Sequence, residues 1–330
     1  MLNIFTAIYH AYLAQAAIVA VKLGVFEHLK DGPKSLDQIC ADTDAHPTPL
    51  RHILKVLCTY EFLEEKEECY HLTKSSVQLM RAENSFIPDY LLYAGEQILP
   101  AFAHLEGAAR TGESAFVLAH GKSLWELCRN DRAQGKIFED HMNSATRWHA
   151  AFVAKALDCS GVKTLVDIGG GHASLVSAVL KRNPHLSAVM LDQPHLADRA
   201  TERLRAEGLL GRCEFVGGDF FRAVPPDADL YTIKHVLHDW KDEEVARILT
   251  NIRAAMRPDS RLVIVEGVMD TGDKDPDWMG ARNLEQFVTT GGYQRTRREF
   301  SALLEAAGLR LDRIQSTPIG DCSLIHAAPR

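Results

Sequence analysis

The amino-acid sequence predicts an α/β protein in which a doubly wound, largely parallel sheet follows a smaller helical domain. From Val162 onward, short apolar runs alternate with amphipathic helical segments, which is the pattern of parallel strands joined by helices. The first run ends in three consecutive glycines and is followed by a helical pattern. Before this region the chain is mainly helical. We therefore expect a helical domain over residues 1–98 and a sheet domain, with linking and pocket-roofing helices, over residues 99–330.

Composition places the chain among ordinary globular proteins, with 46% hydrophobic and 25% charged residues. A net charge of -7 without a basic cluster argues against a nucleic-acid partner. The seven cysteines are scattered and form no Cys-x-x-Cys pair, so we expect neither a disulfide framework nor a zinc site. The apolar stretch Ala11–Val21 is shorter than the roughly 20 residues that a membrane span needs. These features predict a cytoplasmic protein without a membrane partner.

The first domain is expected to be winged-helix-like. A helical segment from Leu2 to about Leu29 precedes two shorter helices, Leu36–Ala41 and His46–Leu57, and two short strands, Phe62–Glu65 and Cys69–Leu72. Such a module often binds DNA. Its second short helix offers only three basic side chains, which is too few for a phosphate-contacting face. We therefore favour a packing or dimer surface.

Between the domains we expect a loop over Gly112–Gly121 and then a long amphipathic helix from about Asp131 to Leu157. Phe138, Met142 and Trp148 recur near helical spacing along this helix. They either pack in a core or roof a pocket for a flat aromatic ligand.

Seven strands are expected in the second domain. Five precede the tail, and the last two form an antiparallel pair at one sheet edge. The expected ranges are Leu165–Ile168, Ala188–Leu191, Glu214–Val216, Leu230–Lys234, Leu262–Glu266, Leu309–Ile314 and Ser323–Ala327. Ligands of such sheets bind at the carboxyl ends of the strands.

The glycine turn is typical of nucleotide cofactor sites, but its motif is incomplete. A nicotinamide dinucleotide fingerprint needs a final glycine where Ser174 stands, and the S-adenosylmethionine pattern needs one where Ala173 stands. Asp192 lies about 20 residues after the turn, where an acidic side chain holds a ribose diol. Asp219 and Phe220 end the third strand with a carboxylate and a ring that suit a purine.

The run Lys234-His235-Val236-Leu237-His238-Asp239-Trp240 closes the fourth strand. A phenol is mostly neutral at pH 7, so its methylation needs a base, and histidine has a matching pKa. His238 is the candidate base, and Glu266, ending the fifth strand, is placed to orient its imidazole. A metal bound by His235, His238 and Glu266 is the alternative. No cysteine or second carboxylate joins these three at ligand spacing, so we expect no metal.

Taken together, the motifs Leu-Val-Asp-Ile-Gly-Gly-Gly, Met-Leu-Asp-Gln-Pro, Gly-Gly-Asp-Phe-Phe, His-Val-Leu-His-Asp-Trp and Thr-Gly-Gly-Tyr-Gln-Arg-Thr resemble the S-adenosylmethionine-dependent small-molecule O-methyltransferases. The resemblance covers nearly the whole chain and implies a class I methyltransferase sheet with an N-terminal dimerisation domain, hence a homodimer. It makes His238 the base, with Glu266 and Gln294 beside it. The cofactor-binding residues that it implies are Asp167, Gly169, Gly171, Asp192, Gln193, Gly218, Asp219, Phe220, Lys234 and Trp240.

The chain departs from this family at two places. Gln294 stands where many members have a second glutamate, which puts the strength of the base in doubt because an amide does not stabilise imidazolium as a carboxylate does. Glu285 and Gln286 replace a common Asn-Met pair, which favours a substrate with a polar or cationic group. The expected substrate-binding residues are Phe138, Met142, Trp148, Asp239, Glu285 and Gln286.

The resulting hypothesis is methylation of a hydroxyl group of a small aromatic substrate, with S-adenosylhomocysteine as the second product. Three alternatives stay open at this point. The protein could be a member of this family that methylates carbon or nitrogen, or that catalyses hydroxylation or a pericyclic reaction. A nicotinamide-dependent dehydrogenase is disfavoured by Ser174. A DNA-binding regulator is disfavoured by charge.

Overall fold

The computed structural model describes residues 3–81, 85–269, 278–320 and 322–330. The chain forms two compact units. The first comprises Met1–Pro100 and Trp125–Ala145, and the second comprises Ala101–Leu124 and Thr146–Arg330. The segment 125–145 thus belongs to the first unit. The single domain boundary after residue 98, which the sequence suggests, stays a prediction.

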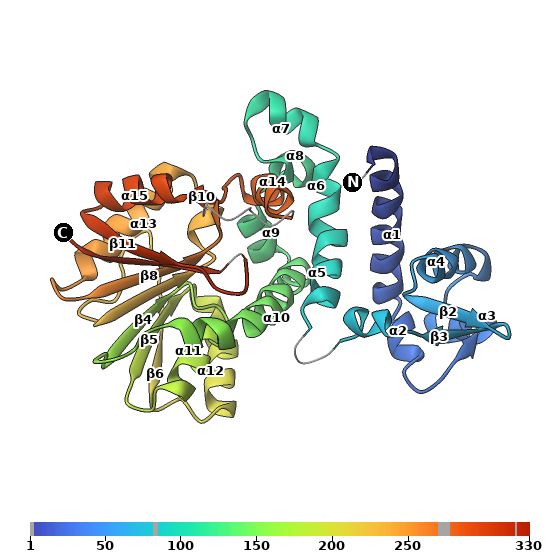
Figure 1. Cartoon of the computed structure of the whole chain (residues 1–330), viewed down its shortest axis with the longest axis horizontal. Helices are drawn as coiled ribbons and strands as arrows, with labels where there is room; N and C mark the ends of the chain where they lie inside the picture. Colours follow the sequence, from blue (N-terminus) through green and yellow to red (C-terminus); the bar gives the residue numbers. More distant parts are fainter. Residues whose placement is uncertain (1–2, 82–84, 270–277, 321) are drawn as a thin grey trace. The chain divides into compact units, whose positions relative to one another are not determined.

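The first unit is built from helices and a small antiparallel sheet of strand order β1-β3-β2 (Figure 1). Ser35 begins α3 with a capping box, in which Ser35 and Gln38 exchange side-chain hydrogen bonds with each other's backbone N–H groups. The expected helix pair and hairpin are confirmed. The elements are α1 (Ile4–Lys22), α2 (Val25–His28), β1 (Lys34–Ser35), α3 (Leu36–Thr43), α4 (Pro47–Thr59), β2 (Leu63–Lys66), β3 (Cys69–Leu72), η1 (Ser75–Leu79), α5 (Ile87–Tyr93) and η2 (Ala94–Ile98).

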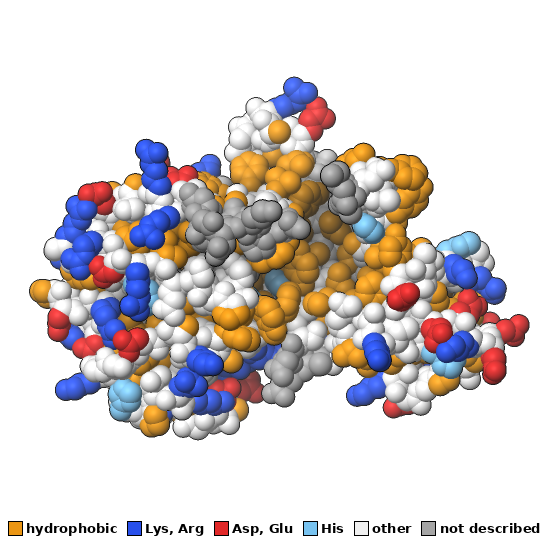
Figure 2. Space-filling view, in the orientation of Figure 1, with side chains coloured by type: hydrophobic (Ala, Val, Ile, Leu, Met, Phe, Trp, Pro, Cys, Tyr) orange, Lys and Arg blue, Asp and Glu red, His pale blue; other side chains and the backbone are white. Residues whose placement is uncertain are grey.

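Helix α1 is longer than the apolar stretch that the sequence singled out. By length and composition alone it could cross a membrane, a weak criterion that core helices of soluble proteins also meet. Its second half is buried in this unit through Ala16, Ala17, Ile18, Ala20 and Val21. Its first half exposes apolar side chains, with Ile4 81%, Phe5 61% and Tyr12 58% exposed. Figure 2 shows hydrophobic side chains gathered where Figure 1 draws this helix.

The second unit contains a seven-stranded sheet of order β11-β12-β8-β7-β4-β5-β6. Strands β4 to β8 pair in parallel, whereas β12 runs antiparallel to both β8 and β11. The seven expected strands are confirmed, including the antiparallel tail pair. Their bounds are β4 (Thr164–Ile168), β5 (Ser187–Asp192), β6 (Cys213–Gly217), β7 (Leu230–Lys234), β8 (Arg261–Glu266), β11 (Leu309–Gln315) and β12 (Ser323–Pro329).

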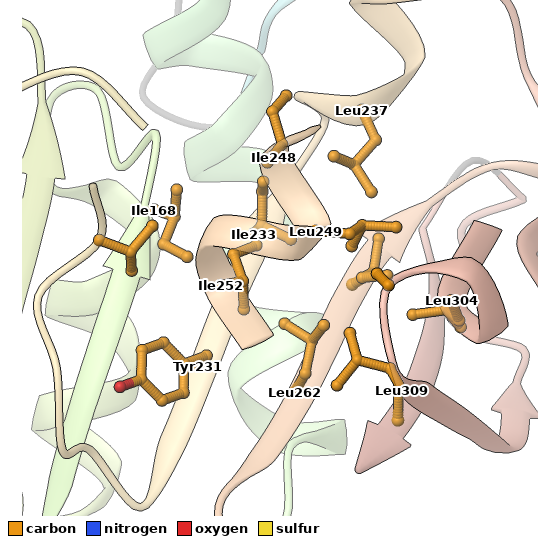
Figure 3. Close-up of a cluster of buried hydrophobic side chains, with 14 of the residues drawn as sticks. Ile168, Tyr231, Ile233, Leu237, Ile248, Leu249, Ile252, Leu262, Leu304 and Leu309 are labelled. Carbon is orange, nitrogen blue, oxygen red and sulfur yellow. The ribbon is translucent and has the colours of Figure 1, made fainter. Parts of the chain in front are cut away.

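Helices cover both faces of this sheet. Alternate residues of β4 enter different apolar clusters, Val166 one and Leu165 the other, because side chains alternate across a strand. Figure 3 shows the first cluster, in which Ile248, Leu249 and Ile252 of α13 face Tyr231, Ile233 and Leu262 of the sheet. The other elements are α11 (Ser174–Arg182), η3 (Pro194–Leu196), α12 (Ala197–Ala206), η4 (Leu237–Asp239), α13 (Asp242–Ala255), α14 (Met279–Thr290) and α15 (Arg297–Ala306), with the short paired strands β9 (Val268–Met269) and β10 (Arg295–Thr296).

The connection between the domains is more helical than expected. It contains α6 (Leu99–Phe102), α7 (Leu105–Thr111), α8 (Ala115–His120), α9 (Leu124–Asn130) and α10 (Arg132–Ala156). The loop expected over Gly112–Gly121 was wrong, because Ser114 caps α8 at its start and Gly121 ends it in the left-handed conformation. The long helix expected from Asp131 to Leu157 is confirmed as α10.

Candidate active site

The glycine turn after β4 brings bare backbone to the carboxyl edge of the sheet. Gly169 and Gly171 adopt left-handed φ angles of 70° and 57°. A Cβ on Gly171 would meet no atom within 4 Å, so the space above its backbone is open. A Cβ on Gly170 would lie 2.4 Å from Met190 Cγ, so this position is closed. The turn therefore combines packing against the sheet with an accessible peptide surface.

The position where the motif has its last glycine has a backbone conformation that favours glycine. Ala173 has a left-handed φ of 61° and is fully buried. Because an alanine in this region is strained, the surrounding fold holds it there. Ala173 thus occupies a conformation that a glycine at this position would adopt without strain.

Asp192 ties the end of β5 to the glycine turn. Its Oδ2 accepts a hydrogen bond of 2.7 Å from the Gly171 N–H, and its Oδ1 accepts one of 2.7 Å from the Gln193 N–H. Burial raises the pKa of the Asp192 carboxyl, and these two hydrogen bonds oppose the rise. The carboxylate is therefore oriented at the sheet edge, where each oxygen retains lone pairs for a ligand diol.

Asp167 lies inside β4, one layer below the turn, and is 1% exposed. Its Oδ1 accepts a hydrogen bond of 2.7 Å from Thr232 Oγ1, and its Oδ2 has no partner among the described residues. Burial raises the pKa of this carboxyl to about 7. A ligand that donates a hydrogen bond or carries positive charge would relieve this cost.

Aromatic rings gather at the neighbouring strand end. Gly218, Asp219 and Phe220 follow β6, and the Gly218 N–H donates to the Asp192 carbonyl at 2.9 Å. The Phe220 ring lies 6.3 Å from the Trp240 ring. Phe221, which the sequence analysis missed, contacts Trp240 edge-on at 4.7 Å. A half-exposed Asp219 carboxylate beside these rings provides the polar and apolar contacts that a purine needs.

His238, in η4 after β7, and Glu266, the last residue of β8, form a buried pair. His238 Nδ1 lies 2.8 Å from Glu266 Oε2, and the two side chains are 7% and 0% exposed. Glu266 Oε1 accepts from the backbone N–H groups of Val236, Leu237 and His238 at 3.0, 2.9 and 3.3 Å. Glu266 thus holds both the imidazole and the loop that carries it.

The charges around His238 set its basicity. Burial lowers the pKa of the imidazole. The Glu266 and Asp239 carboxylates together raise this pKa by more than burial lowers it, so the net shift is upward from 6.5. Because the Glu266 carboxylate accepts from Nδ1–H, the lone pair of the neutral ring is on Nε2. This nitrogen is the one that can take a proton.

Gln294 also reaches the imidazole. Its Nε2 lies 2.9 Å from His238 Nδ1, and its Oε1 has no hydrogen-bond partner among the residues described. An Nδ1 that carries a proton needs an acceptor, so the amide orientation that suits this ring places Oε1 toward Nδ1. Gln294 then supports the same tautomer as Glu266 without adding charge.

Arg295, another residue that sequence analysis missed, fastens the loop after His238. It is fully buried. Its guanidinium donates to the Leu237 carbonyl at 3.0 Å, to the Trp240 carbonyl at 2.8 Å and to Asp242 Oδ1 at 2.9 Å. Three strong hydrogen bonds from one rigid group fix the loop on both sides of the imidazole.

Two expected substrate-binding residues, Asp239 and Gln286, are hydrogen-bonded to each other through their side chains. Gln286 Nε2 donates to Asp239 Oδ1 at 2.7 Å, and this oxygen lies 3.7 Å from His238 Nε2. Burial raises the pKa of the Asp239 carboxyl to about 6, which the neighbouring His238 opposes. Glu285 instead pairs with Arg282 at 3.3 Å. Its charge is thereby partly compensated.

The three expected aromatic-pocket residues of α10 have different surroundings. Phe138 contacts Tyr93 and Trp125 within the first unit, each with ring centroids 5.6 Å apart. Met142 is half-buried in the same unit. Trp148 belongs to the second unit and is 37% exposed. Core packing thus accounts for Phe138, whereas the partly exposed Trp148 ring lies 5.0 Å from the His149 ring and 6.5 Å from the Phe152 ring.

Comparisons with known proteins agree with this arrangement. Residues 102–310 match the model of the O-methyltransferase domain, and residues 5–82 match the O-methyltransferase dimerisation domain. A mitomycin biosynthesis 6-O-methyltransferase of Streptomyces lavendulae is 39% identical, over 94% of this chain and 88% of that protein.

Solved structures are similar over the whole chain. The structure of a mitomycin 7-O-methyltransferase superposes with a TM-score of 0.95 at 36% identity, covering 99% of this chain and 97% of that one. An O-methyltransferase from neocarzinostatin biosynthesis, in complex with S-adenosylhomocysteine and 1,4-dihydroxy-2-naphthoic acid, has a TM-score of 0.85 at 27% identity and 96% coverage of both chains.

Proposed function

The chain belongs to the O-methyltransferase family, and from that premise we propose that it methylates a hydroxyl group of a small aromatic substrate with His238 as general base. The enzyme is an S-adenosylmethionine-dependent O-methyltransferase of small molecules. The base and the aromatic nature of the substrate are our proposal. The observation that carries it is the buried His238–Glu266 pair at the carboxyl edge of the sheet.

The residues at this edge fit S-adenosylmethionine. This cofactor supplies, when bound, a methyl group activated by the positive charge of a sulfonium. The open backbone at Gly171 and the oriented carboxylate of Asp192 suit its methionine and ribose parts. Asp219, Phe220 and Trp240 suit its adenine. We assign Asp167, Gln193, Gly218 and Lys234 to the same site, with Asp167 as the buried carboxylate beneath the turn.

His238 performs the proton transfer in this proposal. When the substrate oxygen takes the methyl group, the methyl–sulfur bond breaks and S-adenosylhomocysteine leaves, and the hydroxyl proton would pass to His238 Nε2. Glu266, already paired with Nδ1 at 2.8 Å, stabilises the imidazolium that results. A base of this kind accelerates a reaction about 10²–10⁴-fold, and alignment of the reactants supplies the larger share.

The substrate side of the site has polar groups near the base. Asp239 is held by Gln286, so its second oxygen can accept from a hydroxyl or amino group adjacent to the reacting hydroxyl. The Arg282 partner of Glu285 reduces the attraction for a cationic substrate that the sequence favoured. We therefore propose a neutral phenolic substrate with a neighbouring hydrogen-bond donor. Trp148, which belongs to the same unit as His238, is proposed to supply an apolar contact to the substrate.

We also propose a homodimer that forms through the N-terminal domain. The match of residues 5–82 to a dimerisation domain supports it, as do the exposed apolar side chains on α1. A reducing, cytoplasmic location is proposed because all seven cysteines are free.

The test is a screen of phenols, hydroxyquinones and N-hydroxy aromatics with labelled S-adenosylmethionine. We expect a methyl ether and S-adenosylhomocysteine in equal amounts for at least one phenol that carries a neighbouring donor. Methylation at carbon or nitrogen only, or turnover without methylated product, would contradict the proposal. Melting with NAD in place of S-adenosylmethionine serves as the control, and a shift with NAD alone would favour a dehydrogenase.

A further inference from the structure

Two imidazoles and a thiol meet beside the proposed base. His149 comes from α10, His235 follows β7 directly, and Cys322 precedes β12 directly. One ligand atom of each lies within 4.8 Å of the other two, and the three residues are 5%, 7% and 0% exposed. None of these contacts is visible in the spacing of the sequence, since the three residues come from distant segments.

The geometry of this cluster is close to that of a zinc site. Cys322 Sγ lies 3.6 Å from His235 Nε2. In a tetrahedral site with Zn–S near 2.3 Å and Zn–N near 2.0–2.1 Å, a sulfur and a nitrogen ligand lie about 3.5 Å apart. The His149 ring stands nearly perpendicular to the His235 ring, with centroids 5.5 Å apart, and its ligand nitrogen lies within 4.8 Å of the other two ligand atoms.

The position of His235 is held by the fold. Its φ of 50° lies in the left-handed region, where a non-glycine residue is strained. Residues kept in such conformations concentrate at functional sites. Here the strained backbone turns the imidazole toward Cys322 instead of continuing the strand.

We propose that His149, His235 and Cys322 bind a thiophilic cation, for which Zn²⁺ is the probe. Two imidazole nitrogens and one thiolate are ligands that zinc prefers, and they leave a fourth position for water. This set differs from the metal site of His235, His238 and Glu266 that the sequence analysis considered. Glu266 is not a candidate ligand, because its Oε2 pairs with His238 and its Oε1 accepts from the backbone of the following loop. The binding site does not depend on the proposed function.

One charge opposes the cation. Lys234 Nζ lies 3.1 Å from His235 Nδ1, and the lysine side chain is buried. The thiolate of Cys322 offsets one of the two positive charges of the metal ion, but the Lys234 ammonium repels the ion. We therefore expect a dissociation constant near the micromolar range, weaker than those of structural zinc sites.

Occupation of the site is expected to affect catalysis. The His235 ring is stacked on the His238 ring, with centroids 5.3 Å apart and an angle of 24° between the planes. A dication held by His235 repels the positive charge that His238 gains when it takes the proton. Zinc is thus expected to inhibit methyl transfer, and a chelator is expected to reverse the inhibition.

The decisive experiment is a titration of the full-length protein with Zn²⁺ by calorimetry, repeated with Co²⁺ to detect the absorption of a thiolate–cobalt bond. We expect one ion per chain and a cobalt–thiolate band. Cys322→Ser should remove the band and weaken zinc binding at least about a hundredfold. His149→Asn should weaken zinc to a similar extent while retaining the thiol.

Cys159→Ser is the matched control. Cys159 is also a buried thiol, 4% exposed, but it is not a member of the His149, His235 and Cys322 group. It should leave zinc binding, the cobalt band and zinc inhibition unchanged. Equal zinc affinity in the wild type and Cys322→Ser, or equal zinc inhibition of both when their melting temperatures agree, would overturn the assignment.

Discussion

Gly292 is the glycine at which a single added methyl group is expected to displace the base. A Cβ at this position would lie 2.0 Å from the His238 carbonyl oxygen, 2.6 Å from the Asp239 carbonyl carbon and 2.8 Å from the Trp240 nitrogen. All three are backbone atoms, so no side-chain rotation relieves the contact. The φ of Gly292 is not in the left-handed region, so alanine adds no strain of its own.

The size of the effect follows from this overlap. Real Cβ atoms rarely come within about 3.4 Å of such neighbours, so Gly292→Ala requires the loop to move by about 1 Å or more. A misplacement of about 1 Å can cost on the order of 10²-fold in rate. We therefore expect kcat to fall about a hundredfold.

The assay is steady-state methyl transfer with saturating S-adenosylmethionine and substrate, together with the melting temperature of each variant. Gly280→Ala is the control, because it lies on the neighbouring helix α14 and its Cβ would meet no atom within 4 Å. The control should retain wild-type kcat. A kcat for Gly292→Ala within twofold of the wild type would refute the view that this loop positions the base.

Two further substitutions test the buried carboxylates. Glu266→Gln should lower kcat about 10²–10⁴-fold. It should also move the acidic limb of the pH profile of kcat/KM, expected above pH 6.5 in the wild type, to lower pH, because the carboxylate that raises the pKa of His238 is lost. An unchanged pH profile would contradict this. Asp167→Asn should stabilise the ligand-free protein in urea by up to about 4 kcal/mol at pH 8 and little at pH 4. The reason is that a carboxyl whose pKa rises to about 7 on folding contributes fully below about pH 3.9 and loses that contribution as pH rises through 7. Equal stabilisation at both pH values would exclude this cause.

Most of the sheet and the strand-end residues could be predicted from the sequence. Apolar runs bounded by glycine, proline and polar residues identify the strands, and parallel strands bring their carboxyl ends to one edge. The placement of His238 near Glu266 follows from these rules, because Glu266 ends β8 and His238 follows the end of the neighbouring parallel strand β7. Local periodicity therefore predicted the elements and the edge at which the site lies.

Contacts between distant segments could not be predicted in this way. Arg295 resembles a surface arginine in the sequence, and only the fold shows that it is buried against the carbonyls of the base loop. Similarly, His149 and Cys322 have no spacing that relates them to His235. Helix α8 was missed because its pattern is one short turn between two glycines, a signal that also fits a loop.

The role of His238 as the base is measured most directly by the single-turnover rate of His238→Ala together with its dissociation constant for S-adenosylmethionine. We predict a rate about 10²–10⁴-fold below the wild type with cofactor affinity nearly unchanged, because His238 takes the proton while other residues hold the cofactor. A wild-type rate, or a loss of cofactor affinity that alone explains the slower reaction, would contradict it.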